Sequence, residues 1–319
     1  MKIRTLGNSE LKISAVIMGT WQAGKDMWVG IDDSQTTEAI RAAFEAGITT
    51  FDTAEAYGKG HSERILGAAI ADVRDRVVIA TKVFANHLKF DQVIAACHRS
   101  LQNLKTEYID LYQIHWPSGS FGTRHVPLEE TMEAMNKLKE QGKIRAIGVS
   151  NFSRSQLEEA VQYGPVESIQ PPYSLFWRKV EKDAMPYCVE KNISVLAYSP
   201  MAQGLLTGKF GANHEFQKGD IRSRNKLFQP DQYQRVQKAL GRLRPIADEL
   251  KISLGQLALA WVISHPRTCA IAGARNKKQA TENAQAAGML LSPGELARID
   301  EIGCLVTDYL DDNPVMWSF

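Results

Sequence analysis

Four side chains capable of acid–base chemistry stand at the ends of short apolar runs. Asp52 ends the run ITTFD, Lys82 ends VVIATK, and His115 follows IDLYQI. Tyr57 comes five residues after Asp52, in a turn that contains glycines. A carboxylate at the end of an interior strand is costly unless it is paired. We therefore expect Asp52 to lie beside a cation, and Lys82 is the candidate.

These four groups suit the protonation of an oxygen that is gaining negative charge. The phenol of Tyr57 has an ordinary pKa of about 10, and a neighbouring Lys82 ammonium is expected to lower that pKa. Asp52 would hold Lys82 in place, so that Tyr57 becomes a general acid near neutral pH. His115 can donate a hydrogen bond that orients a carbonyl oxygen. The set predicts protonation of the oxyanion formed when a carbonyl accepts hydride, a reaction that needs no metal.

A second group of residues suits a hydride-carrying cofactor. Asn151 and Gln170 can hold a carboxamide by paired donor and acceptor contacts, and Tyr198 can stack on a flat ring. Arg275 directly precedes a predicted helix start at Asn276, in the stretch GARNKKQATEN. A helix N-terminus with an adjacent arginine is a good phosphate site.

The elements that carry these residues form a repeated strand and helix pattern. Continuous apolar runs predict eight strands at residues 15–18, 48–51, 77–81, 109–114, 144–149, 166–170, 193–198 and 269–273. Such runs are typical of parallel strands covered on both faces. Helical spacing fills the segments between them, and capping boxes begin at Ser153, Ser253 and Ser292. The pattern predicts a (β/α)8 TIM barrel, an α/β fold. An open doubly wound sheet is the alternative, but no G-x-G-x-x-G follows an early strand.

In such a barrel the carboxyl ends of the strands meet at one mouth, where barrel enzymes place their chemistry. Nearly every predicted strand here ends in a polar or charged residue, which explains why Asp52 is not alone. Trp21 and Trp116 also follow strand ends, so they and Phe84 are predicted to line an apolar substrate pocket. For Trp28, a position in the substrate pocket and a position in the core are both open.

Three segments stand apart from the repeat, although the whole chain, 1–319, is predicted to be one domain. Residues 1–14 are predicted to form an N-terminal β-hairpin. Residues 199–252 form a long connection between the seventh and eighth strands, which is either disordered or a functional lid. Residues 304–319 form a C-terminal tail, and its Trp317 either folds over the mouth or is loosely ordered.

Composition excludes several classes of partner. The chain has 319 residues with 38 Lys and Arg against 36 Asp and Glu, a formal net charge of +2, and no long basic run. Nucleic acid and anionic membranes are therefore not expected as partners. The four scattered cysteines indicate a reduced protein, no apolar run is long enough for a membrane helix, and no signal peptide is visible. We expect a cytoplasmic protein. Its balanced charge favours a monomer, with an oligomer as the alternative.

With these residues in view, the chain resembles the aldo-keto reductase family over essentially its whole length. The resemblance is carried by MGTW (18–21), FDTAEAYG (51–58), ATK (80–82), IHWP (114–117), IRAIGVSNF (144–152), AYSPMAQGLLTGK (197–209) and AGARNKKQATEN (272–283). It is nearest to the branch that includes bacterial and plant enzymes and potassium-channel β subunits.

The resemblance implies an NADP(H)-dependent carbonyl reductase with the catalytic tetrad Asp52, Tyr57, Lys82 and His115. It implies that Ser150, Asn151 and Gln170 hold the nicotinamide amide, that Tyr198 stacks on its ring, and that Arg275 meets the 2′-phosphate. It further implies a set of cofactor-binding residues around these: Gly19, Thr20, Trp21, Asp52, Ser199, Pro200, Met201, Gln203, Gly204, Leu205, Lys209, Arg224, Gly273, Ala274, Gln279, Glu282 and Asn283. The substrate that the resemblance implies is a small carbonyl compound.

Other interpretations remain open at this stage. Asp52 and Lys82 alone would suit a structural ion pair, and Lys82 would suit the Schiff-base lysine of a barrel aldolase. An aldolase does not explain Asn151, Gln170 and Arg275. A redox-sensing or scaffold subunit that binds the cofactor and turns over slowly is the alternative from another class. Arg222 and Arg224 either clamp a pyrophosphate or form a solvated basic patch.

Overall fold

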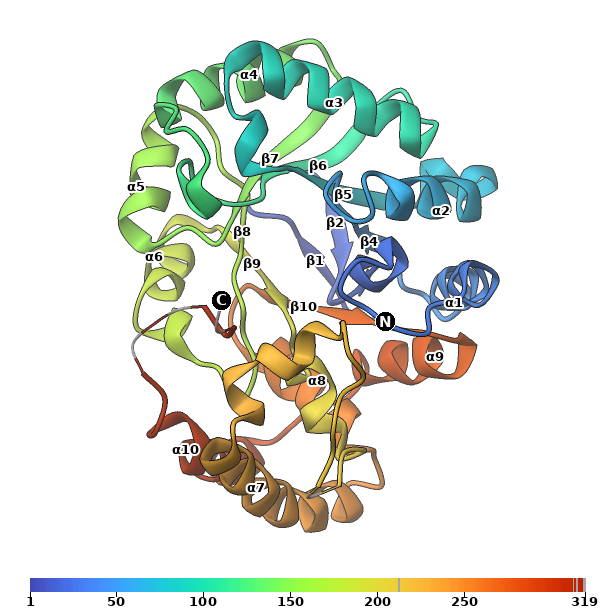
Figure 1. Cartoon of the computed structure of the whole chain (residues 1–319), viewed down its shortest axis with the longest axis vertical. Coiled ribbons are helices and arrows are strands. Elements are labelled where there is room, and N and C mark those ends of the chain that lie inside the picture. Colours follow the sequence, from blue (N-terminus) through green and yellow to red (C-terminus); the bar gives the residue numbers. More distant parts are fainter. Residues whose placement is uncertain (212, 312, 314, 318–319) are drawn as a thin grey trace.

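The computed structural model describes residues 1–211, 213–311, 313 and 315–317. Within them, eight parallel strands close into a barrel in the order β10-β3-β4-β5-β6-β7-β8-β9 (Figure 1). The strands are β3 (Val16–Gly19), β4 (Thr50–Asp52), β5 (Val78–Val83), β6 (Ile109–Ile114), β7 (Ile144–Ser150), β8 (Ser168–Gln170), β9 (Ser194–Tyr198) and β10 (Thr268–Gly273). Each coincides with a predicted strand to within two residues at each end, so the predicted TIM barrel is confirmed.

Helices surround the barrel and cover the outer faces of the strands (Figure 1). They are α1 (Asp33–Glu45), α2 (His61–Ala69), α3 (Phe90–Leu104), α4 (Leu128–Glu140), α5 (Arg154–Gln162), α6 (Ala184–Lys191), α7 (Pro230–Glu249), α8 (Leu254–Ser264), α9 (Lys277–Ala286) and α10 (Pro293–Thr307). The predicted capping boxes open α5, α8 and α10, since the serine side chain in each accepts from the backbone of the third helical residue.

The N-terminal hairpin closes the end of the barrel opposite the mouth. Strands β1 (Ile3–Thr5) and β2 (Lys12–Ser14) pair antiparallel, with Ile3 opposite Ser14. Leu6, Leu11 and Ile13 pack with inward-facing barrel residues in a core of their own. The neighbouring strand positions face outward into the larger core under the helices. With this end sealed by apolar side chains, chemistry is confined to the carboxyl ends of the strands.

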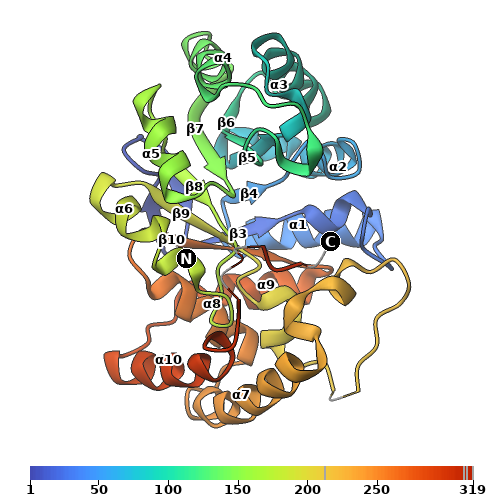
Figure 2. The same ribbon diagram turned by 60° about the vertical axis from the view of Figure 1, so that its left-hand side comes forward.

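The connection at 199–252 is largely ordered in the described residues, with residue 212 outside them. It contains the 3-10 helices η6 (Ala202–Thr207), η7 (Ile221–Arg224) and η8 (Lys226–Phe228), followed by α7. The sequence analysis missed α7, a helix whose buried face includes Val236, Leu240 and Leu243. Helices α7 and α10 pack together on one side of the barrel (Figures 1 and 2).

The C-terminal tail begins later than predicted, because α10 continues to Thr307. Beyond it, the chain returns toward the connection, and Asn225 forms an isolated β-bridge with Trp317. Residues 312, 314 and 318–319 of the predicted tail lie outside the described residues. In the part of the chain described, no helix is both long and apolar enough to cross a membrane.

Candidate active site

The four predicted catalytic side chains meet at the mouth of the barrel. The Nζ of Lys82 lies 2.6 Å from Asp52 Oδ1 and donates over 3.2 Å to the hydroxyl of Tyr57. The same ammonium donates to the carbonyl of Thr53 over 2.8 Å. The ring of His115 stands edge-on to that of Tyr57, with centroids 5.7 Å apart. Asp52 therefore has the buried cationic partner that the sequence required.

The second oxygen of Asp52 is held by amides from two further strands. Gln170 Nε2 donates to Asp52 Oδ2 over 2.8 Å, and Gln113 Nε2 lies 3.5 Å from the same oxygen. Sequence reasoning missed Gln113, because a glutamine inside an apolar run carries no motif. Gln170 is predicted to hold a carboxamide. In the structure, its side-chain amide nitrogen also donates a hydrogen bond to Asp52.

Two glycines fix the turn that carries Tyr57. Gly58 and Gly60 have φ of 62° and 79°, values that a residue with a side chain adopts only under strain. A Cβ placed on Gly24 would lie 2.6 Å from the carbonyl carbon of Tyr57. Gly24 ends the 3-10 helix η1 (Trp21–Gly24), so backbone contact presses this helix against the Tyr57 turn.

Burial shapes the protonation of these groups. Burial raises the pKa of Tyr57, although Lys82 opposes the shift. Burial would lower the pKa of Lys82, but Asp52 and Tyr57 outweigh it, and that pKa is raised. Burial and the Lys82 charge hold the pKa of His115 well below its usual value. Near neutral pH the site therefore contains a neutral phenol, an ammonium and a neutral imidazole.

The expectation that Lys82 lowers the pKa of Tyr57 below its ordinary value is wrong for this structure. The charge of Lys82 is already balanced by Asp52, which itself disfavours phenolate. Removing the phenol from water costs more than the remaining attraction recovers. Tyr57 is therefore protonated near neutral pH, with the Lys82 ammonium within hydrogen-bond distance of its hydroxyl.

The residues predicted to hold a carboxamide and to stack on a ring are linked to one another and to the backbone of His115 by hydrogen bonds. Asn151 Oδ1 accepts from the Tyr198 hydroxyl over 2.9 Å, and Asn151 Nδ2 donates to the backbone carbonyl of His115 over 3.0 Å. Ser150 Oγ donates to the backbone carbonyl of Gln170. Asn151 has φ of 61°, in the left-handed region that asparagine tolerates better than most residues.

A group of cations lies close together, on the 199–252 connection and just before α9: Lys209, Arg222 and Arg275. Arg222 and Arg275 approach the ring of Trp28 to 5.2 Å and 5.7 Å respectively. The pKa of Lys209 is lowered by burial and by the charges of Arg222 and Arg275. The pKa of Arg275 is likewise lowered by burial and by the charge of Arg222. Asp220 pairs with Arg222. These three cations destabilise one another's charge, and one carboxylate, Asp220, lies among them. The remaining positive charge favours binding of a multiply charged anion.

Unpaired buried donors also fit such a ligand. Buried nitrogens of Gln22, Trp28, Gln203 and Arg275 have no hydrogen-bond partner among the described residues. Buried donors are costly when unpaired, and phosphate, ribose and amide oxygens are acceptors. The donor set therefore suits a dinucleotide with phosphate groups.

Side-chain contacts hold Arg275 against the start of α9. The Gln279 side chain accepts from the Arg275 backbone N–H, and the Asn276 side chain accepts from that of Gln279. Asn283 Nδ2 donates to the carbonyl of Gly273. Arg224, by contrast, is exposed, and no interaction of the described residues joins it to Arg222 and Arg275; its role stays a prediction.

The remaining predicted cofactor residues lie at or just after the carboxyl ends of strands, in η6 and in α9. Thr20 Oγ1 donates to the Asp52 carbonyl, linking β3 to β4. Gln203 in η6 has φ of 54°, again a left-handed backbone at a predicted functional position. The others lie at the ends of β3, β9 and β10, in η6 or just before it, and in α9: Gly19, Trp21, Ser199, Pro200, Met201, Gly204, Leu205, Ala274 and Glu282.

A cavity of about 500 Å³ opens at the mouth between the loop after β6 and the C-terminal tail. It is lined by Trp116, Ser120, Phe121, Lys226, Asn313, Val315 and Trp317. Of the predicted pocket residues, Trp116 lines it, while Phe84 stacks on Phe121 and contacts the His115 ring edge-on. Sequence reasoning missed Phe121 and Lys226, which belong to no strand end.

Trp317 joins this cavity to the catalytic residues. Its ring is parallel to that of Tyr198, at 7° and 6.3 Å between centroids, and edge-on to Trp21 at 5.9 Å. Trp21 lies 6.3 Å from the Tyr57 ring. The two open positions for Trp317 are thereby resolved: it folds over the mouth.

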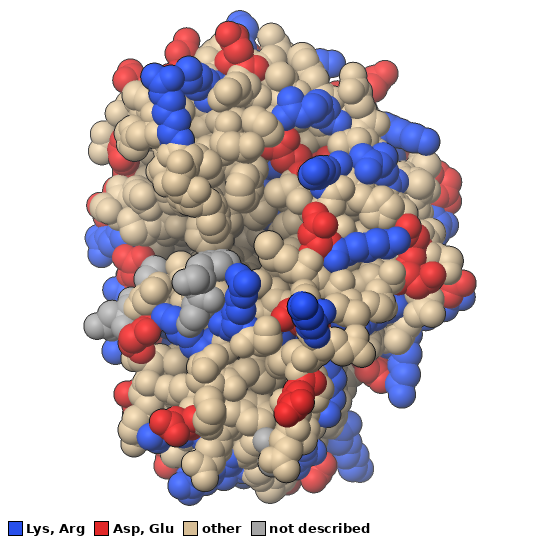
Figure 3. All heavy atoms as spheres, viewed as in Figure 1, with Lys and Arg blue, Asp and Glu red and all other residues tan. Residues whose placement is uncertain are grey.

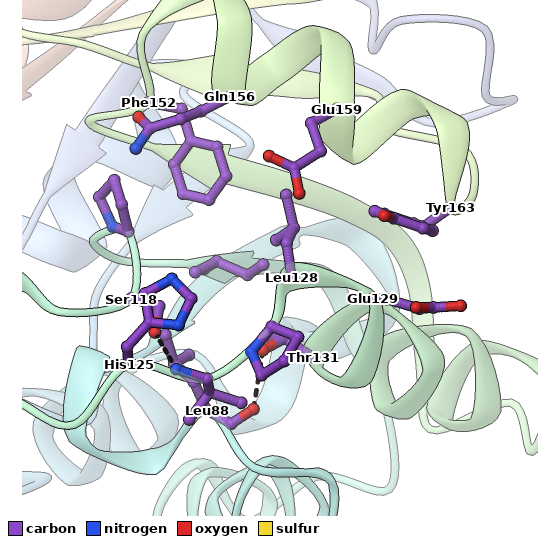
Figure 4. Close-up of a pocket in the computed structure, with 14 residues that line it drawn as sticks. Leu88, Ser118, His125, Leu128, Glu129, Thr131, Phe152, Gln156, Glu159 and Tyr163 are labelled. Atoms are coloured by element: carbon purple, nitrogen blue, oxygen red, sulfur yellow. Dashed lines mark hydrogen bonds between the residues drawn. The ribbon is translucent and has the colours of Figure 1, made fainter.

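A second cavity, of about 260 Å³, lies beside α4 and α5, away from the tetrad (Figure 4). Phe152, Glu159 and Tyr163 line one side, and Leu128 and Thr131 line the other. Thr131 donates to the Leu88 carbonyl, and Ser118 accepts from the Val126 backbone. None of the four catalytic candidates lines this cavity.

The chain belongs to the aldo-keto reductase family. The sequence model of the Aldo/keto reductase family matches residues 15–303. The aldo-keto reductase YhdN of Bacillus subtilis is 37% identical over 314 residues, covering 95% of this chain and 93% of that protein. The NADH-specific methylglyoxal reductase of Escherichia coli is 32% identical and covers 95% of this chain and 98% of its own. A probable voltage-gated potassium channel subunit beta of Arabidopsis thaliana is 31% identical, covering 95% and 96%.

Solved structures of this family share the fold. The glycerol dehydrogenase AKR11B4 of Gluconobacter oxydans superposes with a TM-score of 0.88 and 34% identity, covering 97% of each chain. An aldo-keto reductase of Klebsiella pneumoniae, solved with NADPH, gives a TM-score of 0.77 and 31% identity, covering 100% of each chain. The chain is thus an oxidoreductase of the (β/α)8 aldo-keto reductase class.

Proposed function

We propose that this protein is an NADP(H)-dependent reductase that converts aldehydes or ketones to alcohols. The single observation that carries the proposal is the hydrogen bond from Lys82 to the Tyr57 hydroxyl, inside a mouth that His115 also faces. A neutral phenol beside a buried ammonium is an acid whose conjugate base is stabilised in advance.

Each catalytic residue has a distinct role in this reaction. Tyr57 gives its hydroxyl proton to the substrate oxygen, and Lys82 stabilises the phenolate left behind. Asp52 keeps Lys82 charged and aimed, through the contact of 2.6 Å. His115, neutral near pH 7, donates a hydrogen bond that orients the carbonyl. NADPH, when bound, supplies the hydride to the carbonyl carbon.

The chain's own residues account for cofactor binding. Asn151 and Gln170 would hold the carboxamide, and Tyr198 would pack on the ring. Lys209 and Arg222 would meet the pyrophosphate. Arg275, with the N-terminus of α9, would meet the 2′-phosphate; the unpaired buried nitrogen of Arg275 supports this assignment. One relative is NADH-specific, so the preference for NADPH rests on Arg275.

A redox-sensing or scaffold subunit is a second candidate, which the likeness to a channel β subunit favours. Such a subunit would retain the cofactor tightly and turn over very slowly, and it would be recovered with a partner protein. The complete tetrad favours the reductase.

The reductase proposal is tested by mixing purified protein with NADPH and a panel of aldehydes and following absorbance of the reduced nicotinamide. Multiple turnovers on at least one aldehyde support it. Tight NADPH binding with almost no turnover on any aldehyde favours the scaffold candidate. Borohydride trapping of a substrate on Lys82 would instead indicate an aldolase.

A further inference from the structure

Glu55 lies in the turn between Asp52 and Tyr57, and the proposed reaction gives it no role. Its side chain is only 9% exposed. The carboxylate contacts groups from the loop after β5 and from α3. A carboxylate that is withdrawn from water needs such partners, so these contacts fix where Glu55 lies.

The backbone of Glu55 joins the Tyr57 turn to the strand of Lys82. The Glu55 N–H donates to the Lys82 carbonyl over 3.4 Å, and the Glu55 carbonyl accepts from the Gly60 N–H over 2.8 Å. Tyr57 lies between Glu55 and Gly60 in the chain. The turn is therefore attached to the same residue whose ammonium donates to the Tyr57 hydroxyl.

The Glu55 carboxylate makes a second, shorter contact with the segment that carries Lys82. Its Oε1 accepts from the Phe84 backbone N–H over 2.9 Å. Phe84 directly follows β5, and its ring stands edge-on to that of His115, with centroids 5.5 Å apart. Glu55 thus holds the turn of the acid against the end of β5, beside the residue that packs on His115.

The charge of Glu55 also meets partners nearer the surface. Its carboxylate lies 2.9 Å from His87 Nδ1 and 3.1 Å from an Arg99 nitrogen. Arg99 is 47% exposed, and exposed ion pairs contribute little to stability. Side chains of both signs lie next to one another on the face shown in Figure 3. The contact with the Phe84 N–H, by contrast, uses a charged acceptor that is almost fully shielded from water, which strengthens it.

We propose that Glu55 is a positioning residue, which sets the distance between the Tyr57 hydroxyl and the Lys82 ammonium by fastening the Tyr57 turn to the end of β5. The inference rests on the proposed function and adds a residue to it. The attraction between the ammonium and the phenolate that proton donation leaves behind falls with distance. Without the Glu55 carboxylate, only the longer of its two contacts with this segment remains, the backbone contact of 3.4 Å.

The first experiment compares steady-state kinetics of three variants. Glu55→Ala should lower kcat for aldehyde reduction by about 10- to 100-fold, since a displacement of about 1 Å can cost 100-fold. The aldehyde KM and the Kd for NADPH should stay within a few-fold of wild type. Glu55→Gln keeps an oxygen that accepts from Phe84 and should restore most of kcat. Glu130→Ala is the matched control: Glu130, on α4, accepts from the Phe90 N–H over 3.1 Å, and kcat should not change.

A solvent isotope effect separates positioning from a loss of folded protein. A misplaced acid makes proton transfer slower, so the ratio of kcat in H2O to kcat in D2O should be larger for Glu55→Ala than for wild type. A smaller folded fraction would lower kcat equally in both solvents. An unchanged kcat, or a lower kcat with an unchanged ratio, overturns the inference, while turnover by the wild type upholds the reductase proposal.

A crystal structure of the variant keeps the test independent of catalysis. In Glu55→Ala the distance from Lys82 Nζ to the Tyr57 hydroxyl should exceed the 3.2 Å found here, and Glu55→Gln should restore it. An unchanged distance in Glu55→Ala overturns the inference whether or not any aldehyde is reduced. A longer distance in the variant of a protein that reduces no aldehyde would instead refute the reductase proposal alone.

Discussion

The ammonium of Lys82 donates to the hydroxyl of Tyr57 over 3.2 Å, and both side chains are held among buried groups. The contact joins a strand end to a turn 25 residues earlier in the chain. Burial keeps the phenol protonated. In the proposed reaction the ammonium would stabilise the phenolate that proton transfer leaves behind. This pairing of a resting acid with a stabiliser of its conjugate base underlies the predictions below.

Replacing Tyr57 by Phe should remove the acid and keep the cofactor site. We expect kcat for aldehyde reduction to fall by about 10²- to 10⁴-fold, the usual contribution of a general acid. NADPH affinity, measured by fluorescence titration, should stay within a few-fold of wild type. An undiminished rate would show that another group donates the proton.

The pH dependence follows from the directions of two pKa shifts. Reduction needs Tyr57 in its protonated form. Because the pKa of Tyr57 is raised, activity should be lost only above the pH at which an ordinary phenol gives up its proton. His115 stays neutral because its pKa lies well below the ordinary value. The plot of kcat/KM for reduction against pH should therefore show no inflection between about pH 6 and 8, near the ordinary histidine pKa. An inflection there that disappears in His115→Gln would contradict this account.

Arg275 should decide between the two nicotinamide cofactors. Arg275→Ala is expected to weaken NADPH binding by about 1.5–3 kcal/mol, the value of a hydrogen bond to a charged group, and to leave NADH nearly unchanged. Lys277→Ala, at the exposed first residue of α9, is the matched control. Equal weakening of both cofactors by Arg275→Ala would place the 2′-phosphate elsewhere.

Asn225 links the 199–252 connection to the C-terminal tail. It is fully buried, its amide donates to Gln203 Oε1 over 2.9 Å, and its oxygen accepts from the Leu227 backbone over 2.9 Å. Asn225→Ala leaves these groups unpaired, so the free energy of unfolding in urea should fall by about 1–3 kcal/mol. Asn86→Ala removes the same atoms at an exposed site and should change it by less than about 0.5 kcal/mol. Equal effects would mean that the Asn225 contacts contribute little.

Much of this architecture was predictable because the relevant signals are local. Continuous apolar runs located the barrel strands, and serine capping boxes located three helix starts. The tetrad followed from one rule, that parallel strands end at a common mouth, applied to Asp52, Lys82 and His115. Tyr57 was found because it stands in a turn next to Asp52.

The residues that escaped prediction depend on contacts between distant segments. Lys226 lines the cavity of about 500 Å³ only because residues 225–226 contact the tail: the Lys226 backbone N–H donates to the Met316 carbonyl. Phe121 reaches the cavity from a loop, with φ of 57°. The net pKa shift of Tyr57 was predicted in the wrong direction, because the sequence shows a cation nearby but not the depth of burial.

The most direct test of the central claim is to load the purified protein with NADPH, monitor its fluorescence, and add aldehydes to wild type and Tyr57→Phe in parallel. The account predicts saturable binding to both proteins and rapid oxidation of bound NADPH in wild type only. Oxidation at the same rate in both proteins, or no oxidation in either with any aldehyde, would contradict it.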